Sequence, residues 1–513
     1  MQHFLESHAD RVSGVLSGFD RVLFRGTNRT LSYVEGMEMF LACRGVLYKD
    51  FSAFVQKLSK RIKDHAENTA KRLSRPFHYL ESTSVSKLSL AREIMERDRI
   101  VEGLICVFSC VESCRTYAIK KDRQKKKLRL ISAERKCLHL YFYYVDRQFG
   151  LMHVRLQTWL PFTMHVCING REYLARRMDK AGISYERREN CFTRIDNLPK
   201  AQAILDGLTT RRWCGFLDAL AKRVNPWLDR RAGLDLRSYY WTVRQGEYAT
   251  DVMFKDDQAL AEIYPSLVNH AIEQFSSRDV LRFLGRRITP RFTGEITSDI
   301  VHRHEGIRVK HRVQENSIKM YDKQGSVLRI ETTINNPHRF HVRRMVTRKG
   351  QRQIGWNAMR KGVVDIPRRV EISRAANERY LDALATVNIP GRVREILDPI
   401  SRRVVRDGRP YRALRPVTKD EANLFRAVLD GKHFIQGFRN VDIRRNVAPG
   451  NERDPYERRR AAARVTRLLR LLRAHRLIRK VPSRTYYRVT QKGHRVMSTA
   501  LKLREGEVAA LAA

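Results

Sequence analysis

Cysteine is scarce in this chain, which has eight among 513 residues, spread from Cys43 to Cys214. That density excludes a small scaffold held together by disulfides and predicts reduced, buried thiols. Long apolar runs are missing too, since no stretch approaches the ~18 apolar residues of a membrane helix. The opening residues (MQHFLESHADR) lack the basic and apolar segments of a secretion signal. We therefore expect a cytoplasmic protein with no membrane association.

Acidic residues are also in deficit. The chain has 55 Asp and Glu against 101 Lys and Arg, which leaves a formal net charge of +46. Such an excess goes beyond what solubility requires and predicts a polyanionic partner. A hydrophobic content of 42% is nevertheless ordinary for a folded protein, so the charge belongs to a packed scaffold rather than to a disordered basic tail.

The length and the alternation of helical and strand-like segments predict an α+β protein of several domains. We expect mixed or antiparallel sheets with helices, plus a C-terminal winged helix-turn-helix. The expected regions are an N-terminal α/β region with a β-rich second half (1–200), a helical segment with an antiparallel sheet core (201–365), a helix with a basic linker (366–416) and the winged helix (417–513).

The β-rich region contains two apolar strands joined by the turn Arg147–Gly150, a hairpin signal. Ahead of them lies the charge run KKDRQKKKLR, which is either a solvated loop or a phosphate-contacting loop. Its candidate contacts are Lys125, Lys126 and Lys127.

A zinc site is an alternative use of the cysteines in this region. Cys110 and Cys114 are followed by Cys137 and His139, four soft ligands that could close a tetrahedral site. Cys137 and His139 lie in a strand-like string (LHLYFYY), however, whereas zinc ligands usually come in pairs on tight turns. Buried thiols are therefore the preferred interpretation.

The C-terminal fifth of the chain has the element order of a winged helix. Helical segments are expected at Lys419–Leu429 and near Asn440–Arg445, followed by the long basic run PYERRRAAARVTRLLRLLRAHRLIRK. Two short strands, 477–481 and 485–489, would form the wing, with Arg484 at its tip. A helix fits the major groove of DNA, and a basic loop can reach an adjacent phosphate.

The long basic run predicts a two-faced helix. Its expected buried stripe is Ala463, Leu468, Leu469 and Leu472. Its expected nucleic-acid contacts are Arg459, Arg460, Arg464, Arg467 and Arg470. With the string RLLRAHRLIRK leading into the wing, residues 417–503 resemble the winged helices of MarR-type regulators. That resemblance implies DNA reading; a winged helix used for protein contacts is the alternative.

The middle of the chain carries a polar constellation. Strand alternation and a hairpin turn at Asp322–Gly325 should bring Lys319, Tyr321, Arg329 and Glu331 to one face. Further cations expected on this face are Arg308, Lys310 and Lys323. A face with several cations, a phenol and a carboxylate suits a phosphodiester. A solvated face of cross-strand ion pairs is the competing interpretation.

Two resemblances bear on this segment. The string KMYDK…LRIE is similar to a short pattern in rolling-circle replication initiators, which implies Tyr321 as a nucleophile assisted by lysine. Those initiators also need a His-hydrophobic-His motif, and His302-Arg303-His304 departs from it. The strings FDRVLFRGT, YATDVMF and KMYDK…LRIETTIN, together with the winged helix, resemble a group of basic bacterial proteins associated with mobile elements. That resemblance implies nucleic-acid binding but no defined activity.

A second catalytic hypothesis starts from Asp20, which lies in an apolar strand as the first metal ligand of an RNase H-like transposase would. Asp146 and Asp251 would be its partners, holding Mg²⁺ to activate water. Apart from this Mg²⁺, no cofactor is expected. The sequence therefore leaves three functions: a DNA-binding protein of a mobile element, which we favour; a DNA-cleaving transposase or replication initiator; and a binder of structured RNA. A homodimer is compatible with each.

Overall fold

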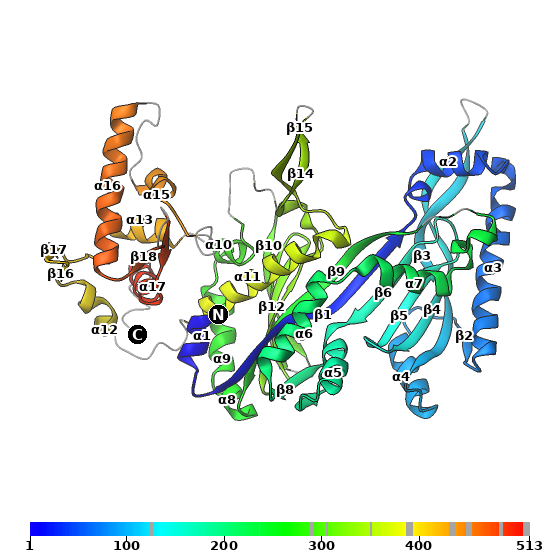
Figure 1. Cartoon of the computed structure of the whole chain (residues 1–513), viewed down its shortest axis with the longest axis horizontal. Coiled ribbons are helices and arrows are strands. Elements are labelled where there is room, and N and C mark those ends of the chain that lie inside the picture. Colours follow the sequence, from blue (N-terminus) through cyan, green and yellow to red (C-terminus); the bar gives the residue numbers. More distant parts are fainter. Residues whose placement is uncertain are drawn as a thin grey trace. The chain divides into compact units, whose positions relative to one another are not determined.

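A computed structural model describes residues 1–122, 127–234, 236, 238–286, 292, 294–303, 306–348, 351–385, 393–429, 437–447, 454–481 and 486–505 (Figure 1). The fold is α+β, as predicted. The chain divides into two compact units. One comprises residues 13–261 and 301–374, and we call it the sheet unit. The other comprises 1–12, 262–300 and 375–513, and we call it the C-terminal unit.

Eleven strands of the described chain form one sheet. In spatial order they are β10 (Ile296–Arg303), β11 (Gly306–Val313), β12 (Asn316–Lys323), β13 (Val327–Thr333), β9 (Tyr240–Phe254), β1 (Val12–Thr27), β6 (Met164–Asn169), β5 (Gly150–Gln157), β4 (Lys127–Asp146), β3 (Gly103–Asp122) and β2 (Phe77–Leu80). The strands from β11 to β9 pair antiparallel, and so do those from β1 to β3. Strand β2 at the far edge is parallel to β3.

The predicted hairpin turn Arg147–Gly150 joins β4 to β5. Gly150 adopts a positive φ of 61°, which glycine tolerates best. The Asp146 carboxylate accepts hydrogen bonds from the backbone N–H groups of Gln148 and Phe149, at 2.8 and 3.0 Å. Asp146 therefore stabilises a turn, and it is not one of the acids beside Asp20.

Helices cover both faces of the sheet because its strands alternate apolar side chains to either side. Val107 of β3 packs in one core with Val55 and Ile62 of α3, whereas Phe108, the next residue, packs in another core with Ile94 of α4. The helices of the sheet unit are α2 (Val34–Ala42), α3 (Phe51–Arg72), α4 (Lys87–Arg97), α5 (Gly170–Lys180), α6 (Leu198–Thr210), α7 (Trp213–Val224) and α8 (Asp257–Ala261).

Two small hairpins complete the sheet unit, β7 (Tyr185–Arg188) with β8 (Cys191–Ile195) and β14 (His341–Arg348) with β15 (Gln351–Ala358). Helix α11 (Ile366–Leu384) follows. The sequence predicts a linker over residues 363–369 (VVDIPRR), but residues 366–369, which include Pro367, form the first turn of this helix. Proline is tolerated there because the first N–H groups of a helix have no intrahelical partner.

The C-terminal unit contains α1 (Gln2–Ser7), α9 (Tyr264–Asn269) and α10 (Ser277–Phe283). Phe275 and Phe283 stack edge-on against Tyr380 of α11, which lies in the part of that helix belonging to this unit.

The described residues between 393 and 505 contribute to one apolar core. Their elements are α12 (Val393–Leu397), β16 (Val404–Arg406), β17 (Arg409–Tyr411), α13 (Lys419–Val428), α15 (Asn440–Val447), α16 (Pro455–Ala474), β18 (Ile478–Lys480), β19 (Tyr487–Val489) and α17 (Gln491–Glu505). Ile396, Ile400 and Leu414 belong to this core, although they precede the expected boundary at residue 417. The segment expected as a basic linker is therefore partly packed.

Two of the eight cysteines, Cys114 and Cys137, are joined in a disulfide between β3 and β4. This differs from the expectation that all thiols are reduced. Cys106, Cys110 and Cys191 are free and buried as expected, whereas Cys43 and Cys214 are free but exposed, so the expectation of buried thiols is wrong for these two. In the part of the chain that the structure describes, no helix has both the length and the apolar composition that crossing a bilayer requires.

Candidate functional site

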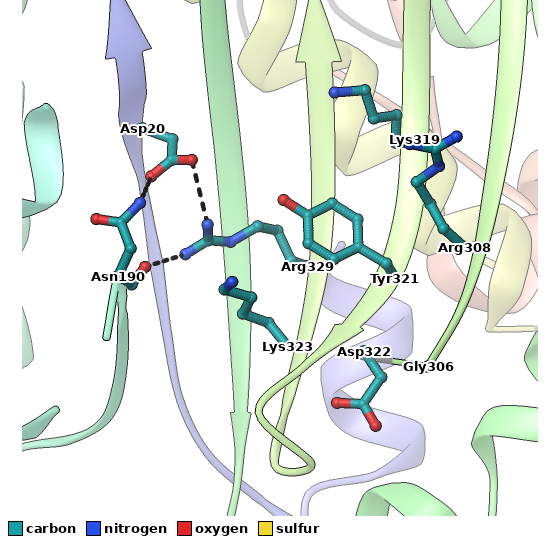
Figure 2. A pocket seen from close by; sticks show the side chains of 9 residues that line it. All are labelled: Asp20, Asn190, Gly306, Arg308, Lys319, Tyr321, Asp322, Lys323 and Arg329. Carbon is teal, nitrogen blue, oxygen red and sulfur yellow. Dashed lines mark hydrogen bonds and ion pairs between the residues drawn. The ribbon is translucent and has the colours of Figure 1, made fainter. Parts of the chain in front are cut away.

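The predicted polar constellation lines a cavity of about 130 Å³ in the sheet unit (Figure 2). Its wall is formed by the polar faces of β11, β12 and β13, together with β1 and the β7–β8 turn. The lining residues are Asp20, Asn190, Gly306, Arg308, Lys319, Tyr321, Asp322, Lys323 and Arg329.

Strand register brings these side chains together as the alternation predicts. Lys319 lies opposite Glu331, and Tyr321 lies opposite Arg329. Lys319 Nζ is 2.6 Å from Glu331 Oε1, and the Tyr321 hydroxyl donates to Glu331 Oε2 at 2.9 Å. On the other side of β12, Arg308 is opposite Tyr321 and Lys310 is opposite Lys319.

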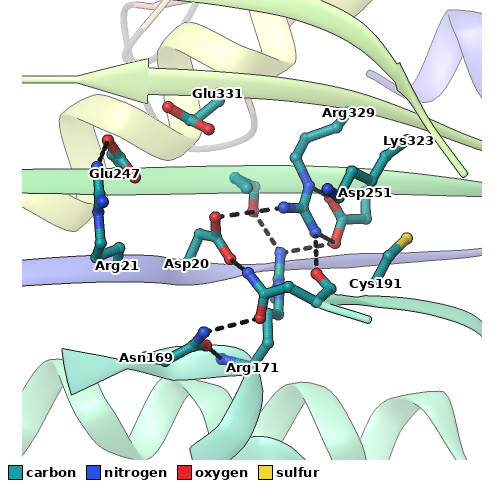
Figure 3. Close-up of polar contacts among 12 residues, drawn as sticks. Asp20, Arg21, Asn169, Arg171, Cys191, Glu247, Asp251, Lys323, Arg329 and Glu331 are labelled. Carbon is teal, nitrogen blue, oxygen red and sulfur yellow. Dashed lines mark hydrogen bonds and ion pairs between the residues drawn. The ribbon is translucent and has the colours of Figure 1, made fainter. Parts of the chain in front are cut away.

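Arg329 is the centre of a buried ion-pair network (Figure 3). Its guanidinium holds both oxygens of Asp251, and its NH1 lies 3.3 Å from Asp20 Oδ2. Arg171, from the first turn of α5, adds a second contact to Asp251 at 2.8 Å. Burial acts to raise the pKa of Asp251, but the two arginines outweigh it and hold that pKa below its usual value. Asp251 is 1% exposed and fully paired, so it does not serve as the predicted metal ligand.

The acids that do lie beside Asp20 are Glu247 of β9 and Glu331 of β13. One carboxylate oxygen from each of the three lies within 4.8 Å of the others. Three buried carboxylates this close repel one another unless cations offset them. Arg329 contacts Asp20, Arg21 contacts Glu247 at 2.9 Å, and Lys319 contacts Glu331. These oxygens are of the type that Mg²⁺ prefers, but an ion here would have to displace cations already in place.

The titration states of this site do not favour nucleophilic attack by Tyr321. Burial, and next the Glu331 carboxylate, raise the pKa of Tyr321 well above its usual value, so the phenol stays protonated. Burial acts to raise the pKa of Glu331 as well, but Lys319 outweighs it and lowers that pKa, which makes the carboxylate a weak base.

The cavity has the chemistry of a site for a small anion. Arg308 Nε is buried and has no hydrogen-bond partner among the described residues. A donor in that position is stabilised by an acceptor that enters the cavity. The cavity volume of about 130 Å³ is several times the space that one ordered water needs. A single phosphate group satisfies these conditions by size and charge.

Several predicted residues lie elsewhere or cannot be placed. Lys125, Lys126, His304 and Arg484 are outside the described residues, while Lys127 is exposed at the start of β4. Residues of the central site that the sequence does not predict include Arg171, Asn190 and Glu247. The sequence does contain a signal that could have placed Glu247 in the site. Glu247 shares the strand EYATDVMF with Asp251 and lies on the same face, four residues away.

The second candidate surface is α16, in the C-terminal unit. Val465, Leu469 and Leu472 are buried on one face, and Leu471 and Ala474 are buried elsewhere around the helix. Ala463, which the sequence predicts in the buried stripe, is exposed, and Leu468 is half-buried. The exposed arginines of α16 include all five predicted from the sequence: Arg458, Arg459, Arg460, Arg464, Arg467, Arg470 and Arg473.

The hairpin β16–β17 lies along the C-terminal half of α16 and forms a groove of about 710 Å³ with it. Arg406 Nε donates to the carbonyl of Ala474 at 3.2 Å, which anchors the hairpin to the helix. Six arginines and one acid, Asp407, line the groove. The arginines are Arg406, Arg409, Arg412, Arg467, Arg470 and Arg473.

Strands β18 and β19 follow α16 as an antiparallel hairpin, at the position predicted for the wing. Phe438, between α13 and α15, exchanges two backbone hydrogen bonds with Tyr487 of this hairpin, at 2.9 and 2.8 Å. The hairpin is thus tied to the segment that precedes α15. Arg479, Lys480 and Arg488 are exposed on it.

Comparison of the chain with protein-family models, with curated proteins and with solved structures found no match.

Proposed function

We propose that this chain is a nucleic-acid-binding protein, with DNA as its main partner and residues 393–505 as a winged-helix reader. One observation carries the proposal: α16 exposes seven arginines along a single helix. The face opposite its buried stripe is cationic over the length of the helix. The resemblance of the sequence to proteins of mobile elements adds such an element as the context. The cytoplasm, which the sequence predicts, is the proposed place of action.

The geometry of α16 supports major-groove binding. A helix of 20 residues is about 30 Å long, and the major groove of B-DNA is about 12 Å wide and admits a helix. The N-terminal half is not covered by the β16–β17 hairpin, and it presents Tyr456, which is 74% exposed, with Arg460 and Arg464. We assign base contacts to this half.

The arginine groove supports a second role, contact with the phosphate backbone. Arg409, Arg467, Arg470 and Arg473 form no ion pair with any described residue. These four guanidinium groups are therefore available to pair with phosphates, and each such pairing releases counterions from the nucleic acid. Arg412 differs, because Glu421 already holds it at 2.6 Å.

The experiment is a binding titration of the full-length chain on labelled duplex DNA, single-stranded DNA and hairpin RNA, at salt concentrations between about 50 and 200 mM. We expect the tightest binding to duplex DNA, with a steep loss of affinity as salt rises. The variant R460A/R464A/R467A should weaken binding and lower the salt slope by about 0.9 for each phosphate that the protein no longer neutralises. Alanine favours helix, so α16 should remain folded.

The matched control removes the same charge from another exposed helix face, as in K60A/K71A/R72A on α3. This control should change affinity much less. Equal losses of affinity in the two triple variants would show that net charge alone drives binding and would contradict the proposal. Preference for hairpin RNA over duplex DNA would favour the RNA alternative.

A second candidate function belongs to the central cavity of the sheet unit. The unpartnered Nε of Arg308 favours an anion there, and we propose that it takes one phosphate of the bound nucleic acid. The test is inorganic phosphate added to the full-length chain. It should raise the unfolding temperature of wild type but not that of Arg308→Met. Equal shifts in both proteins would contradict this assignment.

A further inference from the structure

One face of the β3–β4 hairpin gathers three metal-ligating side chains. Cys114 comes from β3, and Cys137 and His139 come from β4, two residues apart and hence on the same face. One ligand atom of each lies within 4.8 Å of those of the other two. Two sulfurs and an imidazole nitrogen are the donors that zinc prefers.

The hydrogen bonding of His139 fits metal binding. Its Nδ1 lies 3.1 Å from the backbone carbonyl oxygen of Cys137. A carbonyl only accepts, so Nδ1 carries the hydrogen and Nε2 is left to present its lone pair. Metal-binding histidines commonly donate their other ring N–H to a carbonyl or a carboxylate, which fixes the ring. His139 is 2% exposed, so its ring lies buried beside the two cysteines.

Cys110, the fourth ligand suggested by the sequence, is not part of this group. It lies opposite His139 in the strand register, and its sulfur contacts the carbonyl of Val111. Among the residues that the structure describes, three protein donors therefore remain, and a tetrahedral ion would have one further position. Cys114 is partly exposed, so water can reach that position.

We propose that the reduced chain binds a zinc ion through Cys114 Sγ, Cys137 Sγ and His139 Nε2, with water as the fourth ligand. Binding releases the two thiol protons, and the two thiolates balance the charge of the ion. The ion crosslinks two strands that are already paired. It therefore adds to the stability of a folded hairpin and is not required for the hairpin to form.

The disulfide between Cys114 and Cys137 is the oxidised state of the same pair. Hydrogen peroxide can produce it from the zinc-bound state. The two thiolates give up two electrons and form the S–S bond, the peroxide takes these electrons with two protons to give two waters, and Zn²⁺ leaves. The site is thus a zinc centre under reducing conditions and releases its ion on oxidation.

The test uses the full-length chain, reduced with a phosphine, supplied with ZnCl₂ and desalted. Elemental analysis should find one zinc per chain in wild type and in Cys214→Ser, whose cysteine is exposed and free. Cys114→Ser should lose most of it, and peroxide should release zinc from wild type but find none to release in Cys114→Ser. Reduced wild type without zinc, or with zinc that survives Cys114→Ser, would overturn the proposal.

Cobalt provides a measurement that needs no variant to fold. Co²⁺ added to the reduced wild-type chain should produce the absorption of thiolate-to-cobalt charge transfer, and ZnCl₂ should abolish it. A cobalt spectrum without the thiolate band would show that the metal binds elsewhere and would overturn the assignment to the cysteines.

Discussion

Arg329 and Asp251 form a bidentate ion pair in the sheet, with Nε and NH2 of the arginine 2.6 and 2.9 Å from the two carboxylate oxygens. Both side chains are 1% exposed. The strands that carry them, β13 and β9, are neighbours, and Arg329 also contacts Asp20 of β1. One guanidinium therefore links three strands under the central cavity. It also forms ion pairs with two of the acids that a metal-dependent enzyme would need as ligands.

The first prediction concerns this pair. Arg329→Leu should destabilise the chain by about 3–5 kcal/mol, because removing one partner leaves a buried charge without compensation. Urea unfolding measures the change. Arg188→Ala is the control, since its pair with Asp257 is more than half exposed on both sides and should contribute less than about 1 kcal/mol. Similar losses of stability in both variants would mean that burial does not set the strength of the Arg329 pair.

The second prediction concerns pH. Burial is the main cause that raises the pKa of Asp322 to about 6; the N–H of Gly325 opposes the rise and the Asp257 carboxylate adds to it. The unfolded pKa is about 4, so the folded chain binds more protons than the unfolded chain between these values. The contribution of Asp322 to the free energy of unfolding is fully present below pH ~4 and is lost as the pH rises to ~6.

Asp322→Asn has no charge to titrate, yet it keeps an oxygen that can accept from Gly325. The unfolding temperature of the variant should therefore rise relative to that of wild type as the pH increases from ~4 to ~6. Above that range the difference between the two temperatures should stay constant. Parallel curves for the two proteins across this interval would contradict the assignment.

The third prediction follows from the packing of residues 393–414. A chain that ends at residue 416 keeps Ile396, Ile400 and Leu414 but loses the helices that cover them, so it should aggregate. A chain that ends at residue 385 avoids this exposure and should stay soluble. It should bind nucleic acid with less sequence preference, because base readout is assigned to α16. Size-exclusion chromatography and competition between DNA sequences test the two parts.

The central hairpin is predictable because its signals are local. Alternation within β12 and β13, with a turn at Asp322–Gly325, is enough to place Lys319 beside Glu331. The approach of Glu247 to Asp20 is not predictable in the same way. Their strands are more than 200 residues apart in the sequence and are neighbours in the sheet, and no local pattern encodes which distant strands become neighbours.

In helix α16, too, the local sequence pattern does not predict the effect of contacts with other segments. Its period of apolar residues places Leu469 and Leu472 correctly, and the arginines on the opposite face too. Leu471 is buried although it lies on the cationic side, because the β16–β17 hairpin covers that end of the helix. Ala463 has no such cover and is exposed. Tertiary contacts that the helix does not itself encode decide both positions.

The last prediction concerns chemistry at the central cavity. We expect the wild-type chain to cut neither supercoiled, linear nor single-stranded DNA with Mg²⁺ or Mn²⁺, because Tyr321 is protonated beside a weak base and the acids near Asp20 are already paired. Tyr321→Phe should bind DNA as wild type does and form no covalent adduct, since it loses only the hydroxyl. Gel assays of nicking, with a denaturing gel for adducts, provide the measurement.

Cutting by the purified wild-type chain would contradict this expectation, and the variants would identify the mechanism. Loss of cutting and of a covalent adduct in Tyr321→Phe, with Asp20→Ala active, would mean attack by the phenol. Loss in Asp20→Ala, with Tyr321→Phe active, would mean a metal-activated water held by Asp20, Glu247 and Glu331. In that case Lys319→Met should strengthen metal dependence, because it frees the Glu331 carboxylate for the ion. Activity that persists in all three variants would point to a contaminating nuclease.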